Sequence, residues 1–210
     1  MTPWTFFIGH RAEILGATLD HLGLVLIAMF LAITISVPLG MLIVYHKVLR
    51  TLALGVASIL QTIPSLALFG FLIPIPFIGG IGKRTAIVAL VLYALLPILR
   101  NTYVGLTGID PAILESAEAM GMTQRQILFR VRFPLALSVI LAGIRTATII
   151  TIGVATIAAA IGAGGLGTFI FRGVALVNDP LLLAGAIPAA LLAILADTIL
   201  GFLERRLRVT

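Results

Sequence analysis

The stretch Gly108–Pro134, GIDPAILESAEAMGMTQRQILFRVRFP, is the polar interruption around which the rest of this apolar sequence is arranged. Asp110 is a favoured helix N-cap, and Pro111 suits the first helical position, where its missing N–H costs nothing. Gly121 readily adopts the left-handed conformation that ends a helix. We therefore expect a short helix that starts at Pro111 and stops before Gly121.

A second helix is expected directly after this one. Thr123 and Gln126 have the spacing of a capping box, and Pro134 marks where the second helix must end or bend. The stretch thus predicts two short helices joined by a bend at a membrane surface. An amphipathic helix pair that simply lies on the bilayer is the alternative.

The composition excludes an ordinary soluble domain. Of the 210 residues, 60% are hydrophobic and 10% are charged, with a mean hydropathy of +1.21, whereas soluble domains carry roughly 25% charged residues. The chain has no cysteine, which excludes disulfides and cysteine metal sites. The net charge of +6 is spread over loops beside lipid, so no nucleic-acid partner is expected.

The apolar stretches predict an all-α, polytopic bundle of about five membrane-spanning helices. An external or interfacial segment is expected at 1–21, a membrane domain at 22–203 with its polar loop at 108–134, and a basic cytoplasmic tail at 204–210. No cleavable signal peptide is evident. The expected spans are 22–45, 52–74, 85–107, 135–161 and 181–203.

The basic residues favour an external N-terminus and a cytoplasmic C-terminus, because cytoplasmic loops are enriched in Lys and Arg. If the loop at 108–134 is cytoplasmic, the cytoplasmic side carries a larger set of Lys and Arg residues than the external side. The larger set is Lys47, Arg50, Arg125, Arg130, Arg132, Arg205, Arg206 and Arg208; the smaller is Arg11, Lys83, Arg84 and Arg172.

Two features inside the expected spans are unusual. The second span is interrupted by Gln61, Thr62, Pro64 and Ser65. A broken membrane helix tends to face a cavity. The alternative is a simple proline kink that packs against neighbouring helices. Arg145 and Asp197 lie within the fourth and fifth spans, where a pair between them is feasible. We favour a role for this pair in helix packing over a role as a gate or substrate contact.

Two glycine-rich motifs do not qualify as nucleotide sites. Residues 162–167 match G-x-G-x-x-G but follow a membrane span rather than a strand. The stretch 79–85 resembles a P-loop, yet Phe77 and Arg84 occupy positions that need Gly and Ser or Thr. His10, His21 and His46 lack the spacing of metal ligands. We expect no catalytic residue, no metal and no ATP hydrolysis on this chain.

The polar stretch resembles the EAA loop of ABC-importer permeases, in which Glu-Ala-Ala is followed at fixed spacing by Gly and by Ile-x-Leu-Pro. Here Ser116 replaces an Ala, Val131 an Ile and Phe133 a Leu. The resemblance implies that the loop docks on a separate ATPase subunit, which would bind ATP and Mg. The implied coupling residues are Glu115, Ser116, Ala117, Gly121 and Pro134.

Four further segments resemble the osmoprotectant branch of this family, whose members import glycine betaine, carnitine or choline. They are 61–67, 142–147, 161–167 and 182–188. The resemblance implies a MetI-like permease fold in the cytoplasmic (inner) membrane of a prokaryote. It also implies a second permease copy or paralogue, ABC ATPase subunits and an external substrate-binding protein as partners.

Polar residues within the expected spans, together with the proline at the helix interruption, are candidates for a translocation path that binds solute weakly. They are Gln61, Thr62, Pro64, Ser65, Tyr93, Thr146, Thr148 and Thr151. Two other functions remain open: an ABC permease for methionine or another amino acid, and an ion-coupled secondary transporter. A secondary transporter should show an internal inverted repeat, and none is visible.

Overall fold

The computed structural model describes residues 3–207, and every regular element in that range is helical. Residues 1–2 and 208–210, including Arg208 of the expected basic tail, lie outside the described part. The elements are α1 (Pro3–Gly9), α2 (Arg11–Ile43), α3 (Lys47–Thr62), α4 (Ser65–Leu72), α5 (Lys83–Thr107), α6 (Pro111–Ala119), α7 (Gln124–Ile127), the π-helical η1 (Leu128–Arg132), α8 (Phe133–Ile157), the 3₁₀ turn η2 (Ala158–Ile161), α9 (Gly167–Ala175) and α10 (Asp179–Arg206).

Four helices of the described chain are long and apolar enough to cross a membrane, and a bent pair makes a fifth candidate. The four are α2, α5, the continuous helix Gln124–Ile161, and α10. The pair is α3 and α4, which meet at 106° across Ile63 and Pro64. The predicted all-α membrane bundle is therefore confirmed, and its second span is broken where the sequence placed the interruption.

Helix α2 begins at Arg11, well before the predicted start of the first span at residue 22. The hydropathy pattern did not indicate the helical turns before residue 22, because polar residues such as Glu13 and Asp20 lower the mean hydropathy there. Asp20 is held in place by Lys83 of α5, whose Nζ lies 2.7 Å from its Oδ1. At a rise of about 1.5 Å per residue, the 33 residues of α2 exceed the roughly 30 Å hydrocarbon core, so α2 must be tilted or extend beyond that core.

Helix α5 is central and packs against both α2 and α8. Small residues allow the close approach to α8: a Cβ on Gly143 would lie 2.5 Å from the Cβ of Asn101 and 2.7 Å from the Pro97 carbonyl oxygen. The buried core includes Phe69, Leu90 and Ile98, which have no exposed surface. Ala147 and Ile152 of α8 belong to the same core, and the polar stretch connects α5 to α8.

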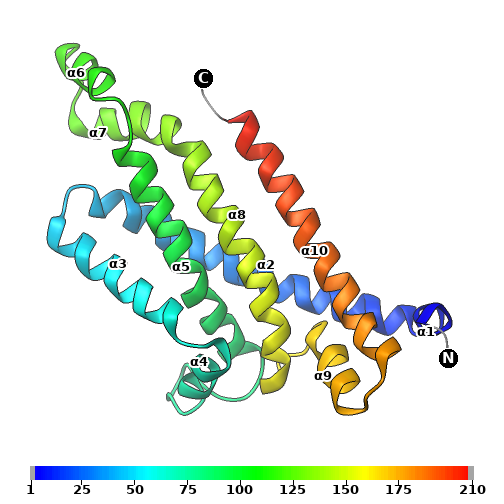
Figure 1. Ribbon diagram of the computed structural model, residues 1–210. Helices are drawn as coiled ribbons and strands as arrows, with labels where there is room; N and C mark the ends of the chain where they lie inside the picture. The colour runs from blue at the N-terminus through cyan, green and yellow to red at the C-terminus, as the bar shows by residue number, and fades with distance from the viewer. Residues whose placement is uncertain (1–2, 208–210) are drawn as a thin grey trace.

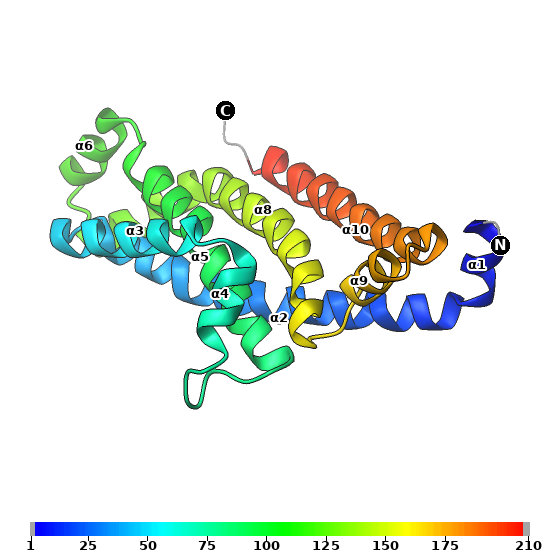
Figure 2. The same cartoon turned by 60° about the horizontal axis from the view of Figure 1, so that its bottom comes forward.

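The two ends of the bundle differ (Figure 1). One end has α6, α7 and the C-terminal end of α10, and the other has α4 and α9. Helix α9 was not predicted, since it is short and follows a glycine-rich turn. Three glycines of that turn, Gly162, Gly164 and Gly165, have φ between 75° and 82°. Figure 2 shows α2 running along one side of the bundle, past α8 and α10.

Candidate functional site

The polar stretch folds into a capped helix that projects from the bundle (Figure 1). The Asp110 carboxylate accepts a hydrogen bond of 2.9 Å from the backbone N–H of Ala112, and Pro111 takes the first helical position. At the other end Gly121 has φ of 77°, and its N–H donates to the Glu118 carbonyl at 2.9 Å. Both ends of α6 are thus fixed by residues that the sequence identified.

The second helix is fixed to the first. Thr123 and Gln126 form the complete capping box, with the Thr123 N–H donating to Gln126 Oε1 at 2.8 Å. Gln124 Nε2 donates to Glu118 Oε1 at 3.0 Å across the bend. These contacts hold α6 and α7 at a defined angle.

Of the two outcomes predicted for Pro134, an end or a bend of the second helix, the structure does not show an end, and the helix changes direction between α7 and α8 (Figure 1). Helix α7 continues through η1 into α8, so Gln124–Ile161 is one helix of 38 residues. A proline ring clashes with the carbonyl four residues before it, and its missing N–H leaves that carbonyl unpaired. The π-helical turn at Leu128–Arg132, where the Phe133 N–H bonds to the Leu128 carbonyl, widens the helix at this point. Helix α7 of the polar stretch and the membrane helix α8 are therefore continuous.

The surface of α6 is mixed in character. Glu115 and Ser116 are exposed, whereas Ala117 is buried toward α7, together with Ile127. Ser116 Oγ donates to the Ala112 carbonyl at 2.7 Å. Met120 is 74% exposed at the tip. A projecting helix with acidic and apolar side chains on its outer surface is suited to docking on another protein.

Arg132, which the sequence did not single out, links this element to α5. Its Nη1 donates to the Leu106 carbonyl at 2.8 Å, in the last turn of α5. That carbonyl has no partner within the helix, as is usual for the last four carbonyls. This bond connects η1 to the end of α5, in addition to its direct continuation into α8.

A charge cluster lies between α8 and α10. Arg145 Nε lies 2.6 Å from Asp197 Oδ1, Nη2 lies 2.9 Å from Oδ2, and Nη1 lies 3.2 Å from Glu204 Oε2. The structure thus places the two predicted partners in contact and adds Glu204. Sequence reasoning missed Glu204, although Asp197, Gly201 and Glu204 share one helix face by their spacing. The side chains of the cluster are 30–40% exposed.

The predicted path residues fall into two groups. Gln61, Thr62, Pro64 and Ser65 surround the break between α3 and α4. Tyr93 joins that group, because its hydroxyl donates to the Ile63 carbonyl at the break. The break is thus tied to α5.

The second group is the three threonines of α8, which differ in environment. Thr146 is exposed, and Thr148 lines a groove beside α2 and α10. Thr151 is fully buried and its hydroxyl lies 3.6 Å from Met29 Sδ, so it faces the core in this conformation. Residues 3–207 contain no group of three side chains placed to hold a metal ion.

Comparison with known proteins identifies relatives across most of the chain. The family described as "Binding-protein-dependent transport system inner membrane component" matches residues 32–209. The carnitine transport permease protein OpuCB of Listeria monocytogenes is 46% identical over 203 residues, covering 97% of this chain and 92% of the relative. The choline transport system permease protein OpuBB of Bacillus subtilis is 45% identical, covering 96% and 92%. The osmoprotectant import permease protein OsmW of Salmonella typhimurium is 47% identical, covering 95% and 94%.

Solved structures share the fold at lower identity. An inward-facing structure of the MetNI methionine ABC transporter matches with a TM-score of 0.81 and 24% identity, covering 93% of this chain and 96% of that one. An amino acid ABC transporter with histidines matches with a TM-score of 0.75 and 20% identity, covering 95% and 96%. The expected MetI-like fold is confirmed.

Proposed function

The chain belongs to the family of inner membrane components of binding-protein-dependent transport systems, and on this premise we propose that it imports quaternary ammonium osmoprotectants with energy from ATP. It is a transport permease rather than an enzyme, and ATP and Mg are bound by a separate ATPase subunit. The observation that carries the proposal is the identity of 45–47% to permeases named for carnitine, choline and osmoprotectant transport.

The coupling step is assigned to α6 and α7. ATP-driven closure of two ATPase subunits moves α6, and Glu115, Ser116, Ala117 and Gly121 form or shape the docking surface. Moving a two-state gate from 1:99 to 99:1 requires about 5.5 kcal/mol of differential binding, so the connection must be stiff. Its stiffness is supported by the capped ends of α6, the Gln124–Glu118 bond and the uninterrupted helix from Gln124 to Ile161.

The exposed side of α8 and α10 is assigned to the translocation path. Arg145, Asp197 and Glu204 lie on membrane helices and are 30–40% exposed in the single chain. Lipid does not solvate charges, so intramembrane charges face protein or a water-filled cavity. A second permease copy or a paralogue would enclose this side, and an external substrate-binding protein would deliver the solute. The coupling element then faces the cytoplasm of a prokaryotic cell, with the N-terminus outside.

Reconstitution tests this proposal. The chain, its ATPase subunits and its substrate-binding protein are placed in proteoliposomes, and uptake of labelled glycine betaine, carnitine, choline and methionine is measured. We expect ATP-dependent uptake of one or more of the three osmoprotectants and none of methionine. Uptake of methionine alone would support an amino acid permease instead, and uptake driven by an ion gradient without ATPase would support a secondary transporter.

A further inference from the structure

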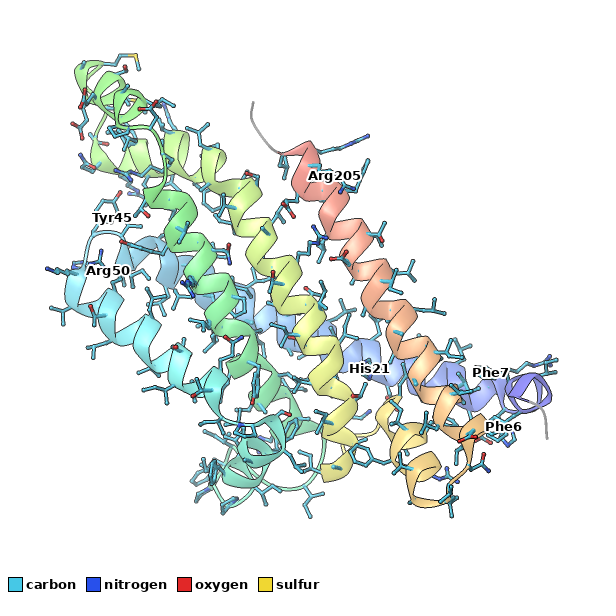
Figure 3. All side chains as sticks on the ribbon, viewed as in Figure 1. Phe6, Phe7, His21, Tyr45, Arg50 and Arg205 are labelled. Atoms are coloured by element: carbon cyan, nitrogen blue, oxygen red, sulfur yellow. The ribbon has the colours of Figure 1, made fainter. Side chains whose placement is uncertain are left out.

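Glu204 and Arg205 of α10 line a pocket that combines charged and hydroxyl groups. The pocket lies between α8 and α10 and has a volume of about 260 Å³. Its other wall is formed by Ser138, Val139 and Ala142 of α8. Figure 3 shows Arg205 at the C-terminal end of α10, which is the end of the bundle where α6 and α7 lie. The pocket is therefore at the cytoplasmic end in the orientation proposed above.

Glu204 is held less firmly than the other carboxylate of the charge cluster. Asp197 makes two contacts with the Arg145 guanidinium, at 2.6 and 2.9 Å, whereas Glu204 makes one contact at 3.2 Å. The guanidinium therefore stays paired with Asp197 when Glu204 turns to another cation. Glu204 can thus exchange its partner without leaving Arg145 unpaired, and an unpaired charge is the costly state in a membrane.

The two charges of the pocket match the two charged groups of a zwitterion. Glu204 provides a carboxylate for a quaternary ammonium group, and Arg205 provides a guanidinium for a carboxylate. Glycine betaine and carnitine carry both groups, whereas choline carries the ammonium group and a hydroxyl. Val139 and Ala142 are apolar and suit the methyl groups of the ammonium. The pocket is smaller than the roughly 300 Å³ of the smallest drug-sized ligand pockets, so it suits a small solute.

We propose that this pocket is the site from which the solute leaves the permease, an assignment that rests on the function proposed above. Glu204 binds the quaternary ammonium group that the three osmoprotectants share. Arg205 binds the carboxylate of glycine betaine and carnitine, so it distinguishes these zwitterions from choline. Glu204 is 30% accessible and Arg205 is exposed. Partly exposed ion pairs are weak, which allows the solute to leave into the cytoplasm.

Uptake by variants tests the roles of the two charges. Glu204→Gln and Arg205→Gln are reconstituted with the ATPase subunits and the substrate-binding protein, and uptake of glycine betaine, carnitine and choline is compared. We expect Glu204→Gln to lower uptake of all three by about fivefold, the scale of a partly exposed ion pair. Arg205→Gln should lower uptake of glycine betaine and carnitine but not of choline. Arg206→Gln is the matched control and should change none of the three, because Arg206 contacts the Phe202 ring and does not line the pocket.

Thiol protection measures occupancy of the pocket without transport, and it does not depend on the folding of Glu204→Gln. The chain has no cysteine, so Ser138→Cys introduces one thiol into the pocket of the full complex. Glycine betaine on the cytoplasmic side should slow alkylation of that thiol, whereas sucrose should not. Met120→Cys, at the exposed tip of α6, should be alkylated at the same rate with and without glycine betaine.

Three results would overturn the assignment while uptake by the unaltered complex leaves the proposed function intact. Equal loss of the three solutes in Arg205→Gln would mean that Arg205 is structural or contacts the ATPase. Alkylation of Ser138→Cys that glycine betaine does not slow would mean that the pocket is not a solute site. A disulfide between two Ser138→Cys chains would mean that a second copy of the chain fills it. A complex that takes up none of the three solutes would overturn the proposed function and the assignment together.

Discussion

Arg145 and Asp197 form a bidentate ion pair between α8 and α10, with Nε–Oδ1 and Nη2–Oδ2 distances of 2.6 and 2.9 Å. Gly201 makes this possible, since a Cβ at that position would lie 3.0 Å from Arg145 Nη1. Glu204 contacts the same guanidinium at 3.2 Å. The single guanidinium of Arg145 thus pairs with two carboxylates. The stability of variants at these positions should therefore depend on which partner is removed.

Arg145→Gln should lower the unfolding temperature more than Asp197→Asn does. Removal of the guanidinium leaves two like charges close together, whereas removal of the Asp197 charge leaves an Arg145–Glu204 pair. Thermal unfolding of the purified chain measures this, with Thr198→Val on the exposed side of α10 as the control. Equal unfolding temperatures combined with lost uptake would instead identify the cluster as a gate or a solute contact.

Gly121→Val should abolish or strongly reduce ATP-driven uptake. The φ of 77° at Gly121 costs an ordinary L-residue about 1–2 kcal/mol, and the strain would shift α6 relative to α7. No atom would lie within 4 Å of a Cβ added at Gly121, so the substitution acts on uptake through the backbone conformation alone. Gly121→Asn should retain more uptake, since Asn tolerates this region better. Equal uptake by the two variants would contradict the explanation.

Tyr93→Phe should destabilise the break between α3 and α4 by about 1 kcal/mol, the usual net value of one hydrogen bond. The Ile63 carbonyl would lose the hydroxyl that pairs with it. The expected result is a lower unfolding temperature and a broader distance distribution between spin labels on α3 and α4. Tyr45→Phe, at a residue that is 45% exposed, should change neither measurement. An unchanged distribution in Tyr93→Phe would show that the break is held by packing alone.

Gly143→Val should destabilise the α5–α8 packing by about 1–3 kcal/mol or more, as overpacked cores usually do. Its Cβ would lie 2.7 Å from a backbone oxygen, which cannot easily move. Gly153 is also on α8 but has no atom within 4 Å of a Cβ, so Gly153→Val is the matched control. Chemical unfolding of both variants measures the difference, and similar midpoints would argue against close packing at Gly143.

Local signals were the most predictive part of the sequence. Asp110, Gly121 and Thr123 determine the ends of α6 and α7 through bonds to residues a few positions away, so their pattern is readable without a fold. The Arg145–Asp197 contact was also predictable, because charges on membrane helices require partners. These features depend on short-range chemistry or on a strong physical constraint.

Features that depend on tertiary contacts were not predictable in the same way. The continuity of α7 with α8 depends on a π-helical turn that absorbs Pro134, and a proline usually signals an end or a bend. The pairing of Asp20 on α2 with Lys83 joins residues that are distant in the sequence. The burial of His21 depends on the turn at Gly165. Glu204 could have been found from its shared face with Asp197.

Site-specific cross-linking tests the central claim, that α6 transmits the motion of the ATPase, most directly. The chain has no cysteine, so Met120→Cys at the exposed tip of α6 and Val177→Cys, which is 89% exposed beyond α9, each introduce one reactive thiol. We predict that Met120→Cys cross-links to the ATPase subunit and loses ATP-driven uptake until the cross-link is reduced, whereas Val177→Cys does not cross-link to that subunit. A Met120→Cys chain that never cross-links to the ATPase, while uptake proceeds normally, would contradict the account.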